Sequence, residues 1–256
     1  MNIIIFDTET IGKVSQDLLN VGYKIIDLNI QNATYKTLVE RDYVVTDLIN
    51  NEIYCLNDDF VGAAKYVKYL DAIRKKETIK RNLPQIFKTL ENDLKRHNVL
   101  FGYAFNSQFD LDKFEKSAKK FGVDNPLASL PVFDIWNYAH EYICNTSDYK
   151  TWACNNNILT ATEVYIQQSV EAICKYLYGD LDFVEEHTAL SDVHHETAIL
   201  VGCVVRGCDI TRPGKNHKLI KSDKLFNQIV VLPNGTEIDF TYTSKYERNG
   251  KTIYKR

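Results

Sequence analysis

Runs of apolar residues near the N-terminus predict a small meander of strands. Residues 3–6 are consecutive apolar residues, and in residues 21–30 and 34–45 apolar positions partly alternate with polar ones, as they do in half-buried strands. Asn32 lies between the last two segments and favours a turn there. We therefore expect these three segments to form an antiparallel sheet.

Helical spacing of apolar residues begins after this meander. Residues 60–73 have that spacing, and Pro84 suits the first turn of a second helix, where no amide hydrogen bond is lost. Residues 99–105 are typical of a buried strand, and an amphipathic helix over 109–121 follows and ends at Gly122. A strand followed by a helix implies a parallel crossover, so the expected sheet is mixed.

The second half of the chain predicts more helices and then a change of character. Helical spacing covers 132–143, 164–178 and a segment that starts near Thr188, whereas the polar stretch 145–157 predicts a long surface loop. The last part has turn signals between β-rich segments, at Pro213-Gly214, Pro233-Asn234-Gly235 and Asn249-Gly250. We expect an α/β domain over residues 1–205 and a small β-rich appendage over 206–256.

Composition places the chain among ordinary globular proteins. With 256 residues, of which 45% are apolar, it can bury a large core. No apolar run reaches the ~18 residues of a membrane span, and the six cysteines form no C-x-x-C pair. We expect a soluble cytoplasmic protein with reduced thiols and no membrane partner.

Charge is distributed unevenly along the chain. Residues 206–256 contain 11 Lys or Arg and 5 Asp or Glu, which gives this part a net charge of +6. The whole chain has a formal net charge of −3, so residues 1–205 have −9. A basic tail beside an acidic body is compatible with a nucleic-acid backbone along one edge, and also with solubility alone.

Two acids end the first predicted strand. Asp7 and Glu9 are two residues apart, so on a strand their carboxylates point to the same side. Carboxylates side by side repel each other unless a cation lies between them. The pair therefore suggests a metal site, although a strand that ends in a solvated acidic turn has the same pattern.

Three further candidates lie at the ends of later elements. Asp110 follows the predicted strand 99–105, at the kind of strand end where α/β sheets bind ligands; its alternative role is the N-cap of the next helix. His187 and Asp192 are five residues apart, which on one helix would separate them by about 140°. They converge only if His187 precedes a helix that starts near Thr188, whose hydroxyl would then cap that helix.

Together these residues resemble the motifs of the DEDD superfamily of 3′-to-5′ exonucleases, the DnaQ-like group with an RNase H-like fold. Its three motifs are matched in order by Asp7-Thr8-Glu9, by Asn106 with Asp110, and by His187 with Ala189 and Asp192. A histidine five residues before the last Asp, instead of a tyrosine four before it, is typical of the DEDDh branch. The resemblance covers about residues 1–205 and implies an RNase H-like mixed sheet flanked by helices.

The resemblance also implies an activity, which is metal-dependent release of nucleoside 5′-monophosphates from a free 3′ end of DNA or RNA. Carboxylate clusters suit hard cations, so two Mg²⁺ or Mn²⁺ ions are the expected cofactors. By the same resemblance His187 takes a proton from the attacking water, and the ions are held by Asp7, Glu9, Asp110 and Asp192. The expected partners are a nucleic acid, preferably single-stranded, and a separate polymerase.

Similar proteins contact the terminal nucleotide through residues beside the acids, which here are Thr8, Thr10, Ile11 and Asn106. Two other functions remain open. An RNase H-like endonuclease would share the acids but would not need His187. A non-catalytic module that binds nucleic-acid ends or a polymerase normally lacks one of the acids, and all four are present here.

Overall fold

A computed structural model of the protein describes the chain with short gaps. The described residues are 1–11, 17–50, 59–162, 164–222, 226–231, 237–242, 244–248 and 251–255. Residues 11, 59–65 and those after 222 are described by their backbone alone.

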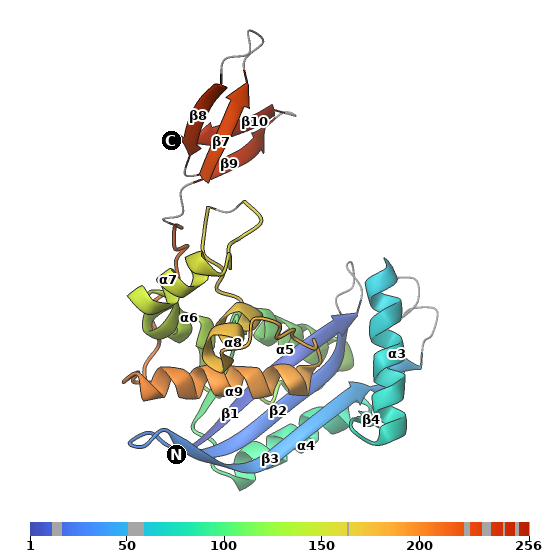
Figure 1. The fold of residues 1–256 in the computed structure, drawn as a ribbon. Helices are drawn as coiled ribbons and strands as arrows, with labels where there is room; N and C mark the ends of the chain where they lie inside the picture. Colours follow the sequence, from blue (N-terminus) through green and yellow to red (C-terminus); the bar gives the residue numbers. More distant parts are fainter. Residues whose placement is uncertain are drawn as a thin grey trace.

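A six-stranded mixed sheet forms the centre of the fold (Figure 1). Its strands are β1 (Asn2–Ile11), β2 (Asp17–Asn29), β3 (Thr34–Val45), β4 (Ile79–Arg81), β5 (Phe101–Ala104) and β6 (Val132–Asp134). They lie in the order β4-β3-β2-β1-β5-β6. The pairs β1–β2 and β2–β3 are antiparallel. The pairs β1–β5, β5–β6 and β3–β4 are parallel. The predicted meander and parallel crossover are confirmed, and the chain is an α/β protein.

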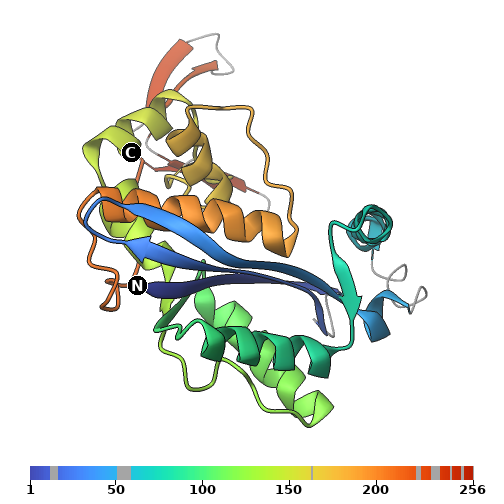
Figure 2. The ribbon, with the colours of Figure 1, turned by 90° about the horizontal axis from the view of Figure 1, so that it is seen from below.

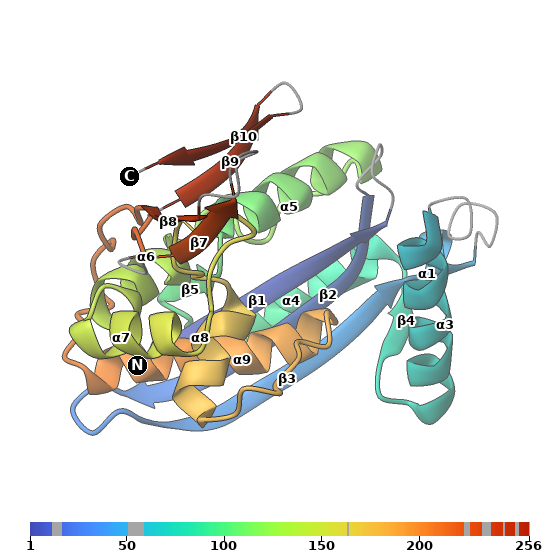
Figure 3. The same ribbon diagram turned by 45° about the horizontal axis from the view of Figure 1, so that its top comes forward.

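Helices cover both faces of this sheet (Figure 2). On one side lie α6 (Ile135–Ala139), the π-helical turn η1 (His140–Cys144), α7 (Ser147–Asn155), α8 (Val170–Tyr178) and α9 (Ala189–Val205). On the other side lie α4 (Leu83–Arg96) and α5 (Ser107–Phe121), while α1 (Thr46–Ile49) and α3 (Asp59–Lys75) lie near the ends of β3 and β4 (Figure 3). The predicted helices over 60–73, from Pro84 and over 109–121 are confirmed.

Alternation along β1 divides the core between these two layers. Ile3 and Ile5 pack with the α6–α9 layer, whereas Ile4 and Phe6 pack with α4 and α5. Because side chains two apart on a strand share a face, the residues that continue the Ile3 and Ile5 series point toward α9. The strand therefore directs its polar end at one particular helix.

The prediction of a loop over residues 145–157 was wrong, because this stretch contains α7. Thr146 caps the helix by accepting a hydrogen bond from the Tyr149 backbone N–H at 3.3 Å. Tyr149 and Ala153 are one helical turn apart and fully buried, so two residues anchor an otherwise polar segment to the core. The abundance of Asn, Ser and Thr around them obscured this pattern.

Two predicted helices begin later than expected. Residues 132–134 form β6 instead of the start of a helix, and Asp134 caps α6 through the backbone N–H of Trp136. In the segment 164–178 the helix begins only at Val170, after Ser169 as its cap. Capping side chains, rather than apolar spacing, set both starting points.

The expected boundary at residue 205/206 falls too early. Cys208, Ile210 and Ile220 are buried in the core layer formed by α6–α9, and the Tyr103 hydroxyl donates to the Ile210 carbonyl at 2.8 Å. The main unit therefore continues to about residue 222. Beyond it, the expected β-rich segments are present as the antiparallel pairs β7 (Phe226–Val231) with β8 (Glu237–Tyr242), and β9 (Ser244–Arg248) with β10 (Lys251–Lys255).

Two further observations concern membrane crossing and the thiols. Within the described ranges, none of the helices combines the length and the apolar character that crossing a membrane requires. The cysteines in these ranges have free thiols, namely Cys144, Cys154, Cys174, Cys203 and Cys208.

Candidate metal centre

The C-terminal half of β1 supplies the first two acids of the site, and the strand continues past both to Ile11. Asp7 and Glu9 continue the Ile3 and Ile5 series and so face α9. The pairing between β1 and β2 shifts register between Glu9 and Thr10, where β1 approaches its end. The sequence prediction that both carboxylates share one side of the strand agrees with this geometry.

The start of α9 supplies the next two residues. His187 precedes the helix and has a left-handed backbone with φ of 54°, as the spacing of the motif required. Asp192 lies in the first turn of α9 and is buried. The expectation that the Thr188 hydroxyl caps the helix was wrong, since this side chain makes no capping hydrogen bond.

Asn20 on β2 takes over the capping function. Its Oδ1 accepts a hydrogen bond from the Ala189 backbone N–H at 2.9 Å and a second from the Tyr69 hydroxyl at 2.9 Å. Its Nδ2 donates to Asp42 Oδ1 at 2.6 Å and to the Tyr43 carbonyl at 2.9 Å. A fully buried amide on the sheet therefore fixes the first turn of α9.

Gly22 allows the helix to lie close to the sheet. A Cβ atom at this position would be 2.4 Å from the backbone carbonyl carbon of Ala189 and 2.4 Å from the backbone nitrogen of Leu190. Any side chain here would push the start of α9 away from β2, because contacts this short do not occur. Asn20 and Gly22 together thus place His187 and Asp192 over the end of β1.

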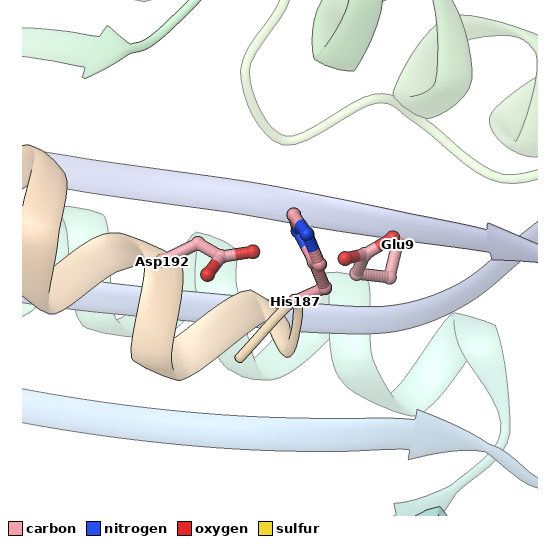
Figure 4. A group of neighbouring side chains, drawn as sticks. All are labelled: Glu9, His187 and Asp192. Atoms are coloured by element: carbon pink, nitrogen blue, oxygen red, sulfur yellow. The ribbon is translucent and has the colours of Figure 1, made fainter. Parts of the chain in front are cut away.

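Glu9, His187 and Asp192 converge in space (Figure 4). Each offers one ligand atom, and these atoms all lie within 4.8 Å of one another. In Figure 4 the two carboxylates point toward the imidazole that lies between them. His187 is exposed, Glu9 half-buried and Asp192 buried, so the group reaches from solvent into the protein.

Asp110 joins the site from α5. The N-cap of this helix is Asn106, so the alternative of Asp110 as the cap was wrong. The Asp110 Oδ1 instead accepts two hydrogen bonds from β1, one from the Thr8 backbone N–H at 2.9 Å and one from the Thr8 hydroxyl at 2.6 Å. This contact ties the acid of α5 directly to the strand that carries Asp7 and Glu9.

The acids of the site perturb one another strongly. Burial raises the pKa of Asp7 well above its usual range, and the neighbouring charges of Asp110, Glu9 and Asp192 raise it further. Burial also raises the pKa of Asp110 to about 7, against the lowering effect of its hydrogen bonds from Thr8. This crowding costs free energy, which a bound cation would offset.

A donor set of this kind fits a hard divalent cation. The Asp7 Oδ2 atom is buried and has no hydrogen-bond partner among the described residues. Such an oxygen normally pairs with a donor or a metal ion, because its desolvation is otherwise uncompensated. Carboxylate oxygens are the ligands that Mg²⁺ and Mn²⁺ prefer.

The residues expected to contact substrate are arranged around the acids. Thr8 is buried, and its amide and hydroxyl both donate to Asp110, so its contacts in this structure are within the protein. Thr10 is half-buried at the end of β1, and the Ile11 side chain lies outside the described part. Asn106 is exposed and has a left-handed backbone with φ of 60°.

Sequence reasoning placed one further acid, Glu196, on the same helix face as Asp192, outside the expected buried stripe, and gave it no role. Glu196 lies one turn after Asp192 on α9 and is only 2% exposed. Its i,i+4 relation to Asp192, on a helix whose buried face is mostly apolar, was the available signal.

Comparison with known proteins adds no relative. No protein-family model matches the chain, and no curated protein matches it. The function therefore has to be inferred from the residues and their geometry.

Proposed function

We propose that the protein is a metal-dependent 3′-to-5′ exonuclease of the DEDDh type, which releases nucleoside 5′-monophosphates from a free 3′ end of DNA or RNA. The observation that carries this proposal is the convergence of Glu9 with His187 and Asp192, whose ligand atoms lie within 4.8 Å of one another. Asp7 belongs to the same cluster, because burial and then the nearby charges of Asp110, Glu9 and Asp192 raise its pKa. Four carboxylates and an exposed imidazole are the set that the resemblance implies.

The sheet supports the same proposal. An antiparallel meander, β1 to β3, is followed by β5 and β6, which extend the sheet in parallel on the other side of β1. This arrangement is compatible with the RNase H-like fold that accompanies the DEDDh motifs. The acids lie at the end of the central strand β1 and on helices from both faces of the sheet.

Two Mg²⁺ or Mn²⁺ ions are the proposed cofactors. When bound, such ions polarise the scissile phosphodiester and favour ionisation of the attacking water. In this chain Asp7, Glu9, Asp110 and Asp192 would hold them. The Thr8 hydrogen bonds fix the orientation of the Asp110 carboxylate, so Thr8 is proposed to position a ligand as well as to contact substrate.

His187 is the proposed general base. It precedes α9 and is exposed, so its imidazole can reach a water beside Glu9 and Asp192. Imidazoles exchange protons near neutral pH, and adjacent carboxylates stabilise the imidazolium that results. Glu9 and Asp192 lie beside the imidazole and would compensate for the charge that it gains.

The nucleic acid is proposed to approach from the exposed side of this group. Asn106 is exposed and lies four residues before Asp110, and it is the proposed contact for a phosphate. Thr10 and Ile11 at the end of β1 would contact the terminal nucleotide. A single strand is the favoured substrate because its 3′ end needs no melting before it enters the site.

A product assay tests the activity directly. The protein with Mg²⁺ or Mn²⁺ is incubated with linear and with circular single strands of DNA and RNA. Shortening of a linear strand to 5′-mononucleotides, with the circle intact, is the expected result. Cleavage of the circle would instead indicate an endonuclease, and an intact linear strand under every condition would contradict catalysis.

Two substitutions separate the metal site from the rest of the fold. Asp7→Asn should abolish hydrolysis, because it removes a carboxylate from the metal site. Asp93→Asn is the matched control: Asp93 is also buried, but it accepts from the Tyr23 hydroxyl at 2.9 Å on the α4 side of the sheet. Equal loss of activity in both folded variants would argue against a role specific to Asp7.

A further inference from the structure

A basic segment, residues 209–221, follows α9 and belongs to the main unit of the fold. It contains one acid, Asp209, and four basic residues, each three positions after the last, so its net charge is +3 when His217 is neutral. The four basic residues are all exposed, and they are Arg212, Lys215, Lys218 and Lys221. Because the chain before residue 206 is acidic overall, this segment differs in charge from the body on which it lies.

Contacts with α6 fix the backbone of the basic segment. The Tyr138 hydroxyl donates to the Arg212 carbonyl at 2.6 Å, and the Asn137 Oδ1 accepts from the His217 backbone N–H at 2.8 Å. Gly214 lies so close to the helix that a Cβ there would be 3.0 Å from the Asn137 Cβ. The backbone is therefore held against the fold, while the basic side chains reach solvent.

A stack of three rings joins the basic segment to the end of β5. Phe105, which follows β5, stacks on Trp136 with the ring centroids 5.5 Å apart, and His217 stacks on Trp136 at 3.6 Å with 10° between the planes. The Asp134 Oδ1 accepts from the backbone N–H groups of Asn106 and Trp136, both at 2.9 Å. The stack thus lies next to Asn106, the proposed phosphate contact.

This stack and the acids of the proposed metal site lie at the same edge of the sheet. β1, β5 and β6 are parallel neighbours, so their carboxyl ends share that edge. Asp7 and Phe105 each lie two residues beyond the paired residues Ile5 and Tyr103. Neighbouring strands are about 5 Å apart, so the stack begins about one strand spacing from Asp7 and leads from there to the basic segment.

We propose that the basic segment is a track for a single-stranded nucleic acid, and that it holds the part of the substrate that lies 5′ of the end in the metal site. This inference deepens the proposed function and rests on it for the direction of the substrate. Proteins hold single strands without regard to sequence by combining cationic side chains with aromatic rings. Positive charge on an otherwise acidic body also directs phosphates to this segment.

The arrangement of the cations favours one nucleic-acid strand over a duplex. All four lie along a single chain segment, and nine residues span at most about 30 Å, so the cations form a line and not a broad face. Arg212 and Lys215 are paired with the acids Asp209 and Glu141 at 3.3 and 2.6 Å. Lys218 and Lys221 make no ion pair with the residues that the structure describes, so they are the sharpest positions for a test.

Lys218→Gln combined with Lys221→Gln removes two cations from the track. Lys88→Gln combined with Lys95→Gln is the matched control, because it makes the same change in net charge at exposed lysines of α4, on the other side of the sheet. Binding of fluorescent oligo(dT) and oligo(U) of about 20 nucleotides, longer than the ~4–16 that one binding fold contacts, is measured by anisotropy. A chelator is present, so that a metal-dependent activity does not degrade the probe.

We expect the track variant to bind at least about tenfold more weakly than the unsubstituted protein at about 0.1 M salt. Each phosphate contact contributes about 0.7 to the slope of log affinity against log salt, so the slope should fall by about 1.4 in this variant. The α4 variant should bind within about threefold of the unsubstituted protein. With Mg²⁺, hydrolysis of a dinucleotide, which is too short to reach the track, should be the same in all three proteins.

Three results would overturn the inference. They are equal losses in the track and α4 variants, which would show an effect of net charge alone, unchanged binding in the track variant, and tighter binding of a duplex of the same length. The proposed function fails separately: if the oligonucleotides bind as expected but no linear strand is shortened with Mg²⁺ or Mn²⁺, the track stands and the exonuclease does not. Hydrolysis that is the same in all three proteins, without the expected binding difference, gives the converse.

Discussion

Replacing Asp110 by Asn should stabilise the metal-free protein while it removes a proposed metal ligand. The Asp110 Oδ1 accepts from the Thr8 amide and hydroxyl, and the Oδ1 of an asparagine can accept the same two hydrogen bonds. The substitution therefore changes the charge of the side chain and little else. Because burial and the neighbouring acids disfavour that charge, the free energy of unfolding should rise.

The size and pH dependence of this effect follow from the pKa of Asp110, which is raised from 3.8 to about 7 in the folded protein. When folding raises the pKa of a carboxyl, its contribution to stability is fully present at pH values below its pKa in the unfolded state. This contribution is lost as the pH rises through its pKa in the folded state. The shift is about three pH units at ~1.4 kcal/mol each, which gives about 4 kcal/mol. The Asn variant avoids this loss, so its advantage should be near zero at about pH 4 and reach up to about 4 kcal/mol above about pH 7.

Urea denaturation in the presence of a chelator, followed at several pH values, measures this difference. Mg²⁺ added near pH 8 should stabilise the unsubstituted protein more than the Asn variant, since only binding to the folded state raises stability. An advantage that does not change with pH, or none at all above pH 7, would refute the charge explanation. Asp93→Asn is the control, and it should lower the free energy of unfolding instead of raising it. The substitution removes the charged partner of Arg41, whose Nε lies 3.5 Å from Asp93 Oδ2.

Further substitutions test how α9 is placed and what His187 does. Gly22→Ala should lower the free energy of unfolding by at least about 3 kcal/mol in urea denaturation, because its Cβ would lie 2.4 Å from Ala189. Gly122→Ala is the control: its Cβ would have no atom within 4 Å, but its φ is +63°, so the loss should be only about 1–2 kcal/mol. Equal losses in the two variants would contradict the importance of the contact with Ala189. Asn20→Ala should lower the free energy of unfolding by at least about 2 kcal/mol in the same assay, because it leaves the Ala189 N–H and the Tyr69 hydroxyl buried without an acceptor. A loss below about 1 kcal/mol would show that another group accepts these two hydrogen bonds. His187→Asn should keep the fold, since Asn tolerates a φ of 54°, yet reduce the hydrolysis rate by about a hundredfold or more, and an unchanged rate would exclude His187 as the base.

The sequence predicted the elements whose pattern is local. The apolar run over 3–6, the turn at Asn32 and the helix end at Gly122 each depend on neighbours within one turn or one strand, and all three are confirmed. The prediction of a loop over residues 145–157 was wrong because two buried residues, one turn apart, hold a polar helix against the core. Composition averages over such a segment, whereas packing depends on the few residues that point inward.

The candidate site was predictable in its charged residues but not in their support. Asp7 and Glu9 could be placed on one side of a strand from spacing alone, and His187 could be placed outside a helix by the same geometry. The cap of α9 was assigned to its nearest hydroxyl, Thr188, although the acceptor comes from Asn20 on another strand. A contact between residues so far apart in the chain leaves no periodic signal in either segment.

This division has a physical reason that also bears on the proposed site. Hard divalent cations prefer carboxylate oxygens among side-chain ligands, so the identity of such ligands is restricted and can be recognised in a sequence. Supporting groups need only present an acceptor, a donor or an absent side chain, as Asn20, Thr8 and Gly22 do. Many residues meet such needs at many places, and only the fold shows which one does.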